Sequence, residues 1–274
     1  MGRAKEIIVK VIPSKIANEF VKKNHYSGKV VANSKLHFGC FLDDKLHGVM
    51  SFGSSLDKSK TIGLVENTNW NDYLELNRMA FDEYLPKYSE SRCIAISIKL
   101  IKKNAPHIKW ILSYADGGQC GDGTIYRASG FVLTSLSNCS IYQNEKGEKY
   151  QQASISARGS LANKEALNIQ YKNNGKFGLV EGFCKEKGLK RISGYSLRYI
   201  YLIDKTCKIT VPIIPFSKID EMGAGMYKGK KITLLERKKQ AELPHKGEDD
   251  SHQNQGAFDS TVPLKSVEKQ LNGQ

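Results

Sequence analysis

The chain has 274 residues, 40% of them apolar, which is enough to bury a core as one globular domain with additions or as two small domains. Its formal net charge of +14 favours an anionic partner such as nucleic acid, acidic lipid or a phosphorylated cofactor, although a basic protein without such a partner has the same charge. The six cysteines include no Cys-x-x-Cys pair, which argues against a zinc ribbon or a disulfide framework and suits a reducing cytoplasm. No run approaches the ~18 apolar residues of a membrane span, so we expect a cytoplasmic protein without membrane contact.

The first predicted elements are a strand and a helix. Residues 6–13 (EIIVKVIP) predict a strand that ends at a proline. Ser14 is placed to cap a helix that runs to about Lys23. Three apolar residues share one face of this helix, namely Ile16, Phe20 and Val21.

A hairpin and a third strand are expected next. Residues 36–53 contain two apolar-rich runs joined by Asp43-Asp44-Lys45, which is typical of a hairpin. Residues 70–81 (WNDYLELNRMAF) alternate in the manner of a strand.

The strongest helical pattern covers residues 89–106. Ser89 or Ser91 is placed to cap this helix, three isoleucines form its apolar face and Pro106 ends it. After it come a buried strand, a short helix and another strand, predicted over 108–116, 123–129 and 131–137.

This order of elements predicts an α/β fold. A helix lies between the strands at 73–81 and 108–116, as a right-handed parallel crossover requires. The ligand crevice of such a sheet is expected outside the carboxyl ends of these two strands.

The second half of the chain has weaker patterns. Helical segments are expected within 160–190, a strand at 195–204, and short strands over 208–235. We expect three regions: a catalytic core over 1–140, an α+β extension of the same domain over 141–235, and a polar, disordered tail over 236–274.

Several stretches resemble known protein families. The order of elements together with YRASGF (126–131) resembles the GNAT acyltransferase fold. The longer runs HYSGKVVANSKLHFG (25–39), ELNRMAF (75–81), GDGTIYRASGF (121–131) and TVPIIPFSKIDEMGAGMYKGKKI (210–232) are similar to the phage Mom family of DNA-modification proteins.

The resemblance implies a GNAT-like fold, with a mixed, mostly antiparallel sheet, a parallel central strand pair and flanking helices. It also implies a transferase that converts adenine in double-stranded DNA to the N-carbamoylmethyl form at the 6-amino group. Such a modification protects phage or prophage DNA from restriction in a bacterial host.

The donor site of the GNAT fold lies at the start of its long helix, where backbone N–H groups and the helix dipole favour the coenzyme A pyrophosphate. In this chain the corresponding segment is SESR, and its side-chain donors are Ser89, Ser91 and Arg92. The usual Gly-x-Gly or Gly-x-Ala pattern is absent there. This departure argues against coenzyme A, so two acyl donors stay open, acetyl-CoA and a glycyl donor.

Five residues are candidates for catalysis, namely His25, Tyr26, Arg78, Asp116 and Tyr126. The resemblance places Tyr126 where GNAT enzymes protonate a leaving group, and a phenol suits that task. His25 can accept a proton from an attacking amine or orient it. A buried Arg78 needs an anion, either Asp116 or a phosphate. His25, Tyr26 and Asp116 also have the donor atoms for a metal such as iron, although no spacing requires one.

Contacts with DNA are expected from residues 186–205, which mix basic residues with tyrosines. The candidates are Lys190, Arg191, Arg198 and Tyr199. Two alternatives remain, a GNAT N-acetyltransferase of a small molecule, RNA or protein amine, and a basic DNA-binding protein without catalysis.

Overall fold

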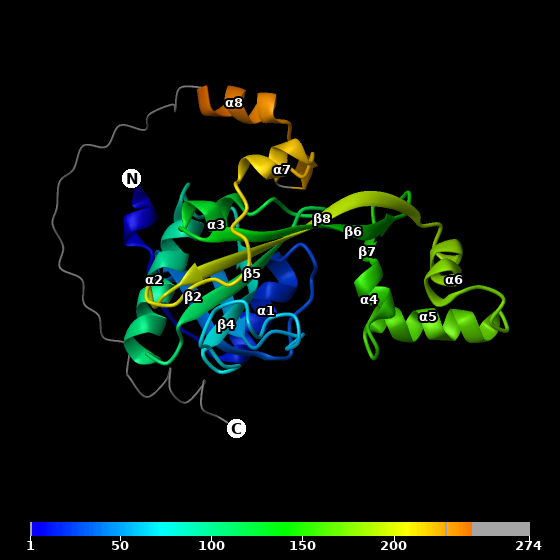
Figure 1. The fold of residues 1–274 in the computed structure, drawn as a ribbon, viewed down its shortest axis with the longest axis horizontal. Coiled ribbons are helices and arrows are strands. Elements are labelled where there is room, and N and C mark those ends of the chain that lie inside the picture. The colour runs from blue at the N-terminus through cyan, green and yellow to red at the C-terminus, as the bar shows by residue number, and fades with distance from the viewer. Residues whose placement is uncertain (1, 228, 243–274) are drawn as a thin grey trace.

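The structure is a computed structural model that describes residues 2–227 and 229–242. An eight-stranded sheet with the order β1-β2-β3-β4-β5-β8-β6-β7 forms its centre, and a two-stranded sheet accompanies it (Figure 1). The strand pairs of the large sheet are antiparallel except for β4 and β5, which are parallel. The predicted mixed, mostly antiparallel sheet with a parallel central pair is therefore confirmed.

The N-terminal elements follow the expected order. A short 3-10 helix, Arg3–Glu6, precedes β1 (Ile8–Val11) and α1 (Ser14–Asn24). The predicted cap at Ser14 is wrong, because α1 begins at Ser14 and has no side-chain cap. Ile16 was also misplaced on the apolar face, since it is 44% exposed while Ala17 and Val21 are buried.

The predicted hairpin consists of β2 (Ser34–Leu42) and β3 (Lys45–Gly53). Asp43 and Asp44 both have positive φ, 50° and 58°, as a two-residue turn of the right twist requires. β4 (Tyr73–Phe81) extends this antiparallel half of the sheet.

The crossover that creates the parallel pair is α2 (Ser89–Asn104), which leads to β5 (Trp110–Asp116). The buried side of α2 includes Ile94, Ile98 and Ile101, as predicted. Neither Ser89 nor Ser91 caps it, because the residue before the helix is Tyr88 in the left-handed conformation and no side chain accepts a capping bond. α1 and α2 cover opposite faces of the sheet. Val49 of β3 belongs to the apolar cluster that includes residues of α1, and the next residue, Met50, belongs to the cluster that includes residues of α2.

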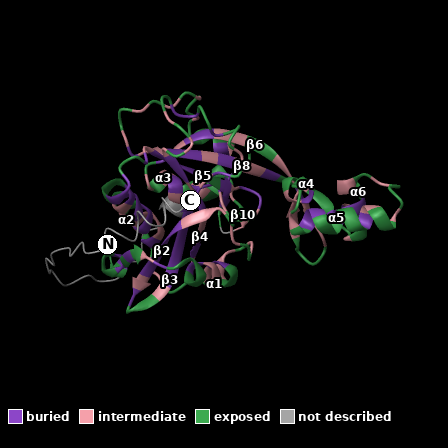
Figure 2. Cartoon of the chain, turned by 90° about the horizontal axis from the view of Figure 1, so that it is seen from below, coloured by how far each residue is buried: buried purple, intermediate pink, exposed green. Residues whose placement is uncertain are grey.

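A separate lobe extends from the sheet. After α3 (Thr124–Ala128), the long strands β6 (Val132–Gln143) and β8 (Lys190–Leu202) pair along their length and project beyond the body (Figure 1). At their far end lie β7 (Lys149–Gln151), α4 (Gln152–Ser156), α5 (Leu161–Lys172) and α6 (Leu179–Glu186). These helices share a small apolar core of their own, as Figure 2 shows by the buried residues between them.

The C-terminal part returns to the body. β8 lies between β5 and β6, so a strand that follows the lobe in sequence is a central member of the sheet. The chain continues through α7 (Ser217–Glu221), β9 (Met226–Tyr227), β10 (Lys230–Lys231) and α8 (Leu234–Glu242). The start of the predicted disordered tail is therefore helical up to residue 242, and residues 243–274 lie outside the described part of the chain.

No helix within residues 2–227 and 229–242 combines the length and apolar character needed to cross a bilayer.

Candidate active site

A cavity opens where the two parallel strands diverge. β4 and β5 pair only from Tyr73–Trp110 to Glu75–Leu112, after which β4 stays with β3 and β5 with β8. The space that follows is a cavity of about 500 Å³, lined by both diverging ends (residues 76–81 and 114–116), the end of α1, the loop 120–123, α3 and β9. The expected crevice at the carboxyl ends of the parallel pair is present.

The lining of the cavity comes from both faces of the sheet. Ala80 belongs to the apolar cluster on the α1 side, whereas Ala115 and Tyr126 belong to the cluster on the α2 side. The cavity therefore occupies the gap that the two diverging strands leave between these faces.

All five candidate catalytic residues line this one cavity: His25, Tyr26, Arg78, Asp116 and Tyr126. They come from the end of α1, from β4, from β5 and from α3, which are brought together only by the fold.

Tyr126 is 8% exposed and packs against the rings of Phe131 and Tyr199, at centroid distances of 5.5 and 5.3 Å. Burial raises its pKa to about 12, so the phenol is protonated at neutral pH. The phenol therefore carries a proton at the wall of the cavity that it can give to a strongly basic leaving group.

His25 is held by its own turn. The backbone N–H of Ser27 donates to Nδ1 of His25 at 3.1 Å, and the Ser27 hydroxyl lies 2.8 Å from the same nitrogen. Burial and the nearby charge of Arg78 lower the pKa of His25 to about 4. The ring is therefore neutral at pH 7 with the proton on Nε2, so it can donate a hydrogen bond to a substrate but is a poor base at that atom.

The Tyr26 ring packs against that of His25 at a tilt of 32°, with ring centroids 4.2 Å apart, and Tyr26 is 51% exposed. Burial of its hydroxyl and the charge of Asp116 raise its pKa. Its ring is thus an exposed aromatic surface at the wall of the cavity.

Arg78 is fixed by backbone carbonyls and not by a carboxylate. Its Nε donates to the Lys29 carbonyl at 2.8 Å and its Nη1 to the Asn77 carbonyl at 2.7 Å. The expected ion pair with Asp116 is absent among residues 2–227 and 229–242. Burial lowers the pKa of Arg78. Its guanidinium can therefore bind an anion in the cavity.

Asp116 has both a structural and a possible chemical role. Its Oδ1 accepts the Gly118 N–H at 3.0 Å, which closes an Asx turn, and its Oδ2 accepts from the Gln151 amide at 2.7 Å. Burial nevertheless raises its pKa above the ordinary value. A carboxylate with a raised pKa is a stronger base than an exposed carboxylate with the ordinary pKa.

The predicted donor-binding residues do not line the cavity. The hydroxyl of Ser89 donates to the Pro86 carbonyl at 2.5 Å, and that of Ser91 to the Tyr88 carbonyl at 3.2 Å. Arg92 donates to the Lys5 carbonyl at 3.1 Å. Only Glu90 of this segment lines the cavity, and its carboxylate would repel a pyrophosphate. These side chains do not fit the diphosphate of coenzyme A.

The four predicted DNA contacts separate into two groups. Lys190 and Arg191 are exposed at the start of β8, on the arm that carries the lobe. Arg198 is half-buried and donates to Thr134 of β6 at 3.0 and 3.2 Å. Tyr199 is fully buried and its hydroxyl donates to the Asp122 carbonyl, so the predicted contact of Tyr199 with DNA is wrong.

Sequence reasoning missed several residues of the cavity, among them Cys120, Asp122 and Tyr227. Cys120 is a free thiol whose pKa is raised by burial and by the charge of Asp116. Gly123 has a φ of +82° and the Tyr199 ring occupies the space of a Cβ, which explains the glycine in this loop. The sequence GDG was a signal for this tight loop.

No cluster of three or more His, Cys, Asp or Glu side chains with the arrangement of a metal site occurs among the described residues. His25, Tyr26 and Asp116 line the same cavity, but nothing in their contacts indicates an iron site.

Comparison with known proteins identifies the family. A model of the Mom protein family matches residues 6–218. The chain belongs to the Mom protein family. This Mom-family chain is 34% identical over 155 residues to methylcarbamoylase mom of Escherichia phage Mu. The aligned part is 56% of this chain and 64% of the phage protein, so the chain spans less than two thirds of its curated relative.

Solved structures of acetyltransferases are also similar to this Mom-family chain. An IAA acetyltransferase from Bacillus cereus ATCC 14579 matches with a TM-score of 0.38 and 10% identity, over 72% of this chain and 99% of its own. The ribosomal-protein-S18-alanine N-acetyltransferase from Escherichia coli matches with a TM-score of 0.38 and 9% identity, over 72% and 94%. Similarity of this degree says nothing about the reaction or its ligands.

Proposed function

We propose that this Mom-family chain modifies adenine in double-stranded DNA, converting the exocyclic 6-amino group to its N-carbamoylmethyl form. One observation supports this above all: the cavity between β4 and β5 gathers a phenol, a carboxylate, a neutral imidazole and a guanidinium that forms no ion pair with the described residues. The phage Mu relative is named a methylcarbamoylase, which supports the class of group transferred.

The acceptor determines what the cavity must provide. The 6-amino group of adenine is conjugated with the ring, so it is a weak nucleophile, and in the duplex it is paired and stacked. The base therefore has to be extruded into a pocket with aromatic or apolar walls, which costs a few kcal/mol. Tyr26, Tyr114 and Tyr227 supply such walls around the cavity.

Two side chains of the cavity then carry out the two proton transfers of the reaction. The Asp116 carboxylate takes a proton from the attacking nitrogen, and the Tyr126 hydroxyl gives a proton to the leaving group of the donor. His25 donates a hydrogen bond through Nε2 and orients the base. Arg78 stabilises the negative charge that develops on the carbonyl oxygen under attack.

The donor is proposed to be an activated acyl compound, and a glycyl donor accounts for the atoms of the product. After glycyl transfer to the 6-amino nitrogen, the free glycyl amine attacks the ring carbon C6. The bond from C6 to the original nitrogen breaks, that nitrogen takes the proton of the amine, and it becomes the carboxamide. Feeding cells with ¹⁵N-glycine should then label the nitrogen attached to the ring and not the carboxamide, and an unlabelled modification would refute this donor.

The partner is proposed to be duplex DNA in a bacterial cell that contains the phage or prophage. The charge of the chain suits this partner, and protection from host restriction is the expected benefit.

Nucleoside mass spectrometry of plasmid DNA from expressing cells tests the function. We expect a deoxyadenosine heavier by the carbamoylmethyl group, absent with the empty vector. Unmodified DNA from cells that contain folded protein would contradict the proposal.

A further inference from the structure

A small hairpin forms part of the wall of the cavity. β9 (Met226–Tyr227) pairs with β10 (Lys230–Lys231), and both residues of β9 line the cavity. Met226 is buried at 4% exposure, whereas Tyr227 is 52% exposed. This hairpin follows residue 218, where the match to the family model ends.

The hairpin is bonded to the loop that leads from β5 to α3. The Asp122 N–H donates to the Met226 carbonyl at 3.1 Å, and the Met226 N–H donates back to Asp122 Oδ2 at 3.2 Å. A third bond runs from the Gly229 N–H to the Cys120 carbonyl at 2.7 Å. Tyr227 is therefore held against the same loop that positions the Tyr126 helix.

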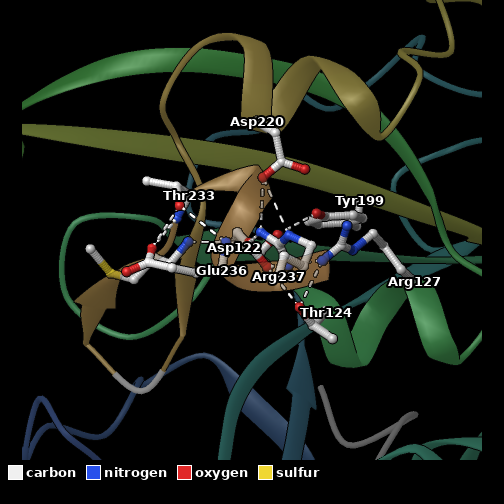
Figure 3. A network of polar contacts seen from close by, with 9 residues as sticks. Asp122, Thr124, Arg127, Tyr199, Asp220, Thr233, Glu236 and Arg237 are labelled. Carbon is white, nitrogen blue, oxygen red and sulfur yellow. Dashed lines mark hydrogen bonds and ion pairs between the residues drawn. The ribbon is translucent and has the colours of Figure 1, made fainter. Parts of the chain in front are cut away.

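An ion-pair network fixes this arrangement (Figure 3). Nη2 of Arg237, from α8, lies 2.5 Å from Asp122 Oδ2, while its Nε donates to Asp220 at 3.2 Å. Arg127 contacts the other carboxylate oxygen of Asp122 at 3.2 Å. Because the Asp122 side chain is completely buried, these bonds hold the hairpin firmly in place.

The outer surface of the hairpin is basic and aromatic. Lys230 and Lys231 are exposed, and neither forms an ion pair within the described part of the chain. Lys230 is paired with Tyr227 and Lys231 with Met226, so the two lysines leave opposite faces of the hairpin. An exposed tyrosine at a cavity, with a lysine in solvent on either face, suits a ligand that has a flat ring and a phosphate on each side. An extruded nucleotide still linked to its strand has both.

We infer that the β9–β10 hairpin receives the extruded adenine. Tyr227 stacks on the base at the cavity, and Lys230 and Lys231 contact the phosphates that flank it. The inference rests on the proposed function and adds the element that holds the substrate.

The test compares one adenine in two duplexes of the same sequence, paired with thymine in one and facing an abasic site in the other. Purified protein and each duplex are incubated in extract of the expressing host, which supplies the donor, and the rate of modification is measured. Base stacking on an aromatic side chain contributes ~1–3 kcal/mol, so Tyr227→Ala should slow modification of the paired adenine about fivefold or more. For the adenine that faces the abasic site, which is extruded at least cost, the same variant should reduce the rate of modification clearly less.

Two variants serve as controls. Tyr227→Phe keeps the aromatic face and should retain most of the rate, and Tyr171→Ala removes an 86% exposed tyrosine of the lobe. A Tyr227→Ala rate within twofold of wild type on the paired adenine would overturn the inference, as would an equal loss on both duplexes. If the wild-type protein modifies neither duplex, the proposed function itself fails, and the inference fails with it.

Discussion

His25 shows how a single turn decides the chemistry of a side chain. The bonds from Ser27 to Nδ1 fix the tautomer, and burial beside Arg78 removes the positive charge at neutral pH. The imidazole is thereby turned from a candidate base into a hydrogen-bond donor, and the proposed base of the site is Asp116.

We predict that His25 titrates near pH 4 and that its Nε2 is protonated at pH 7. Because the folded pKa lies below the ordinary value of about 6.5, the unfolded chain binds more protons between these two values, and His25 destabilises the fold as the pH falls through that window. NMR of ¹⁵N-labelled imidazole, with His25→Gln for assignment, measures the titration and the tautomer. A midpoint near 6.5 would contradict the account.

Among single residues, the sequence identified those whose role depends on local pattern. Asp116 is the last residue of a recognisable strand and Tyr126 lies in the short helix predicted after it, and both line the cavity. Tyr199 was misassigned because the tyrosines of β8 share one face of the strand, and only the packing against Gly123 and Tyr126 shows that this face is buried at Tyr199.

At the scale of elements, the attachment of the C-terminal segment is the main structural device. Arg237 and Asp122 are 115 residues apart in sequence, and their contact joins α8 to the loop before α3. Burial alone would raise the pKa of Asp122, but the bonds from Arg237 and Thr124 hold it below the ordinary value.

Arg237→Ala should lower the free energy of unfolding by about 3 kcal/mol at pH 7, the lower end of the range for a broken buried pair, because Arg127 still contacts Asp122. Since the folded pKa of Asp122 is depressed, this stabilisation is present above its unfolded pKa of about 3.9 and is lost as the pH falls through the folded pKa. Urea unfolding of both proteins at pH 7 and in acid measures the difference. If wild type and Arg237→Ala differed by the same free energy of unfolding at pH 7 and in acid, the ion pair would not be the source of that difference.

The hairpin of β2 and β3 and the helix α2 were predictable from sequence, because the spacing of their apolar residues and their turn residues depends only on neighbouring positions in the chain. The insertion of β8 between β5 and β6 was not, since strand order depends on contacts across the lobe. The Arg237 contact left no local signal, and α8 was taken as part of the polar tail.

On the scale of the whole molecule, the net charge should govern association with DNA. Each phosphate contact releases counterions, so the slope of log affinity against log salt concentration reports the number of contacts. Replacing both Lys230 and Lys231 by alanine should reduce the magnitude of this slope by roughly 2. The matched Lys→Arg pair keeps the charge and should preserve the slope, and an unchanged slope in the alanine variant would exclude these phosphate contacts.

Part of the architecture was predictable because a long helix between two predicted strands is typical of the right-handed parallel crossover that joins β4 and β5. That crossover places the cavity where β4 and β5 separate, and the candidate residues follow from it. The lobe of α4 to α6 could be recognised as helical, but its position at the end of an arm could not.

The central claim is that this cavity modifies DNA, and nucleoside mass spectrometry of plasmid DNA from cells expressing matched variants tests it most directly. Tyr126→Phe should reduce the carbamoylmethyl deoxyadenosine by ~10²–10⁴-fold in rate, the usual contribution of a general acid. Asp116→Asn, which can still close the turn at Gly118, should also abolish the product, while Tyr171→Phe should not. Undiminished product in both cavity variants, with all proteins equally folded, would place the chemistry elsewhere and contradict the account.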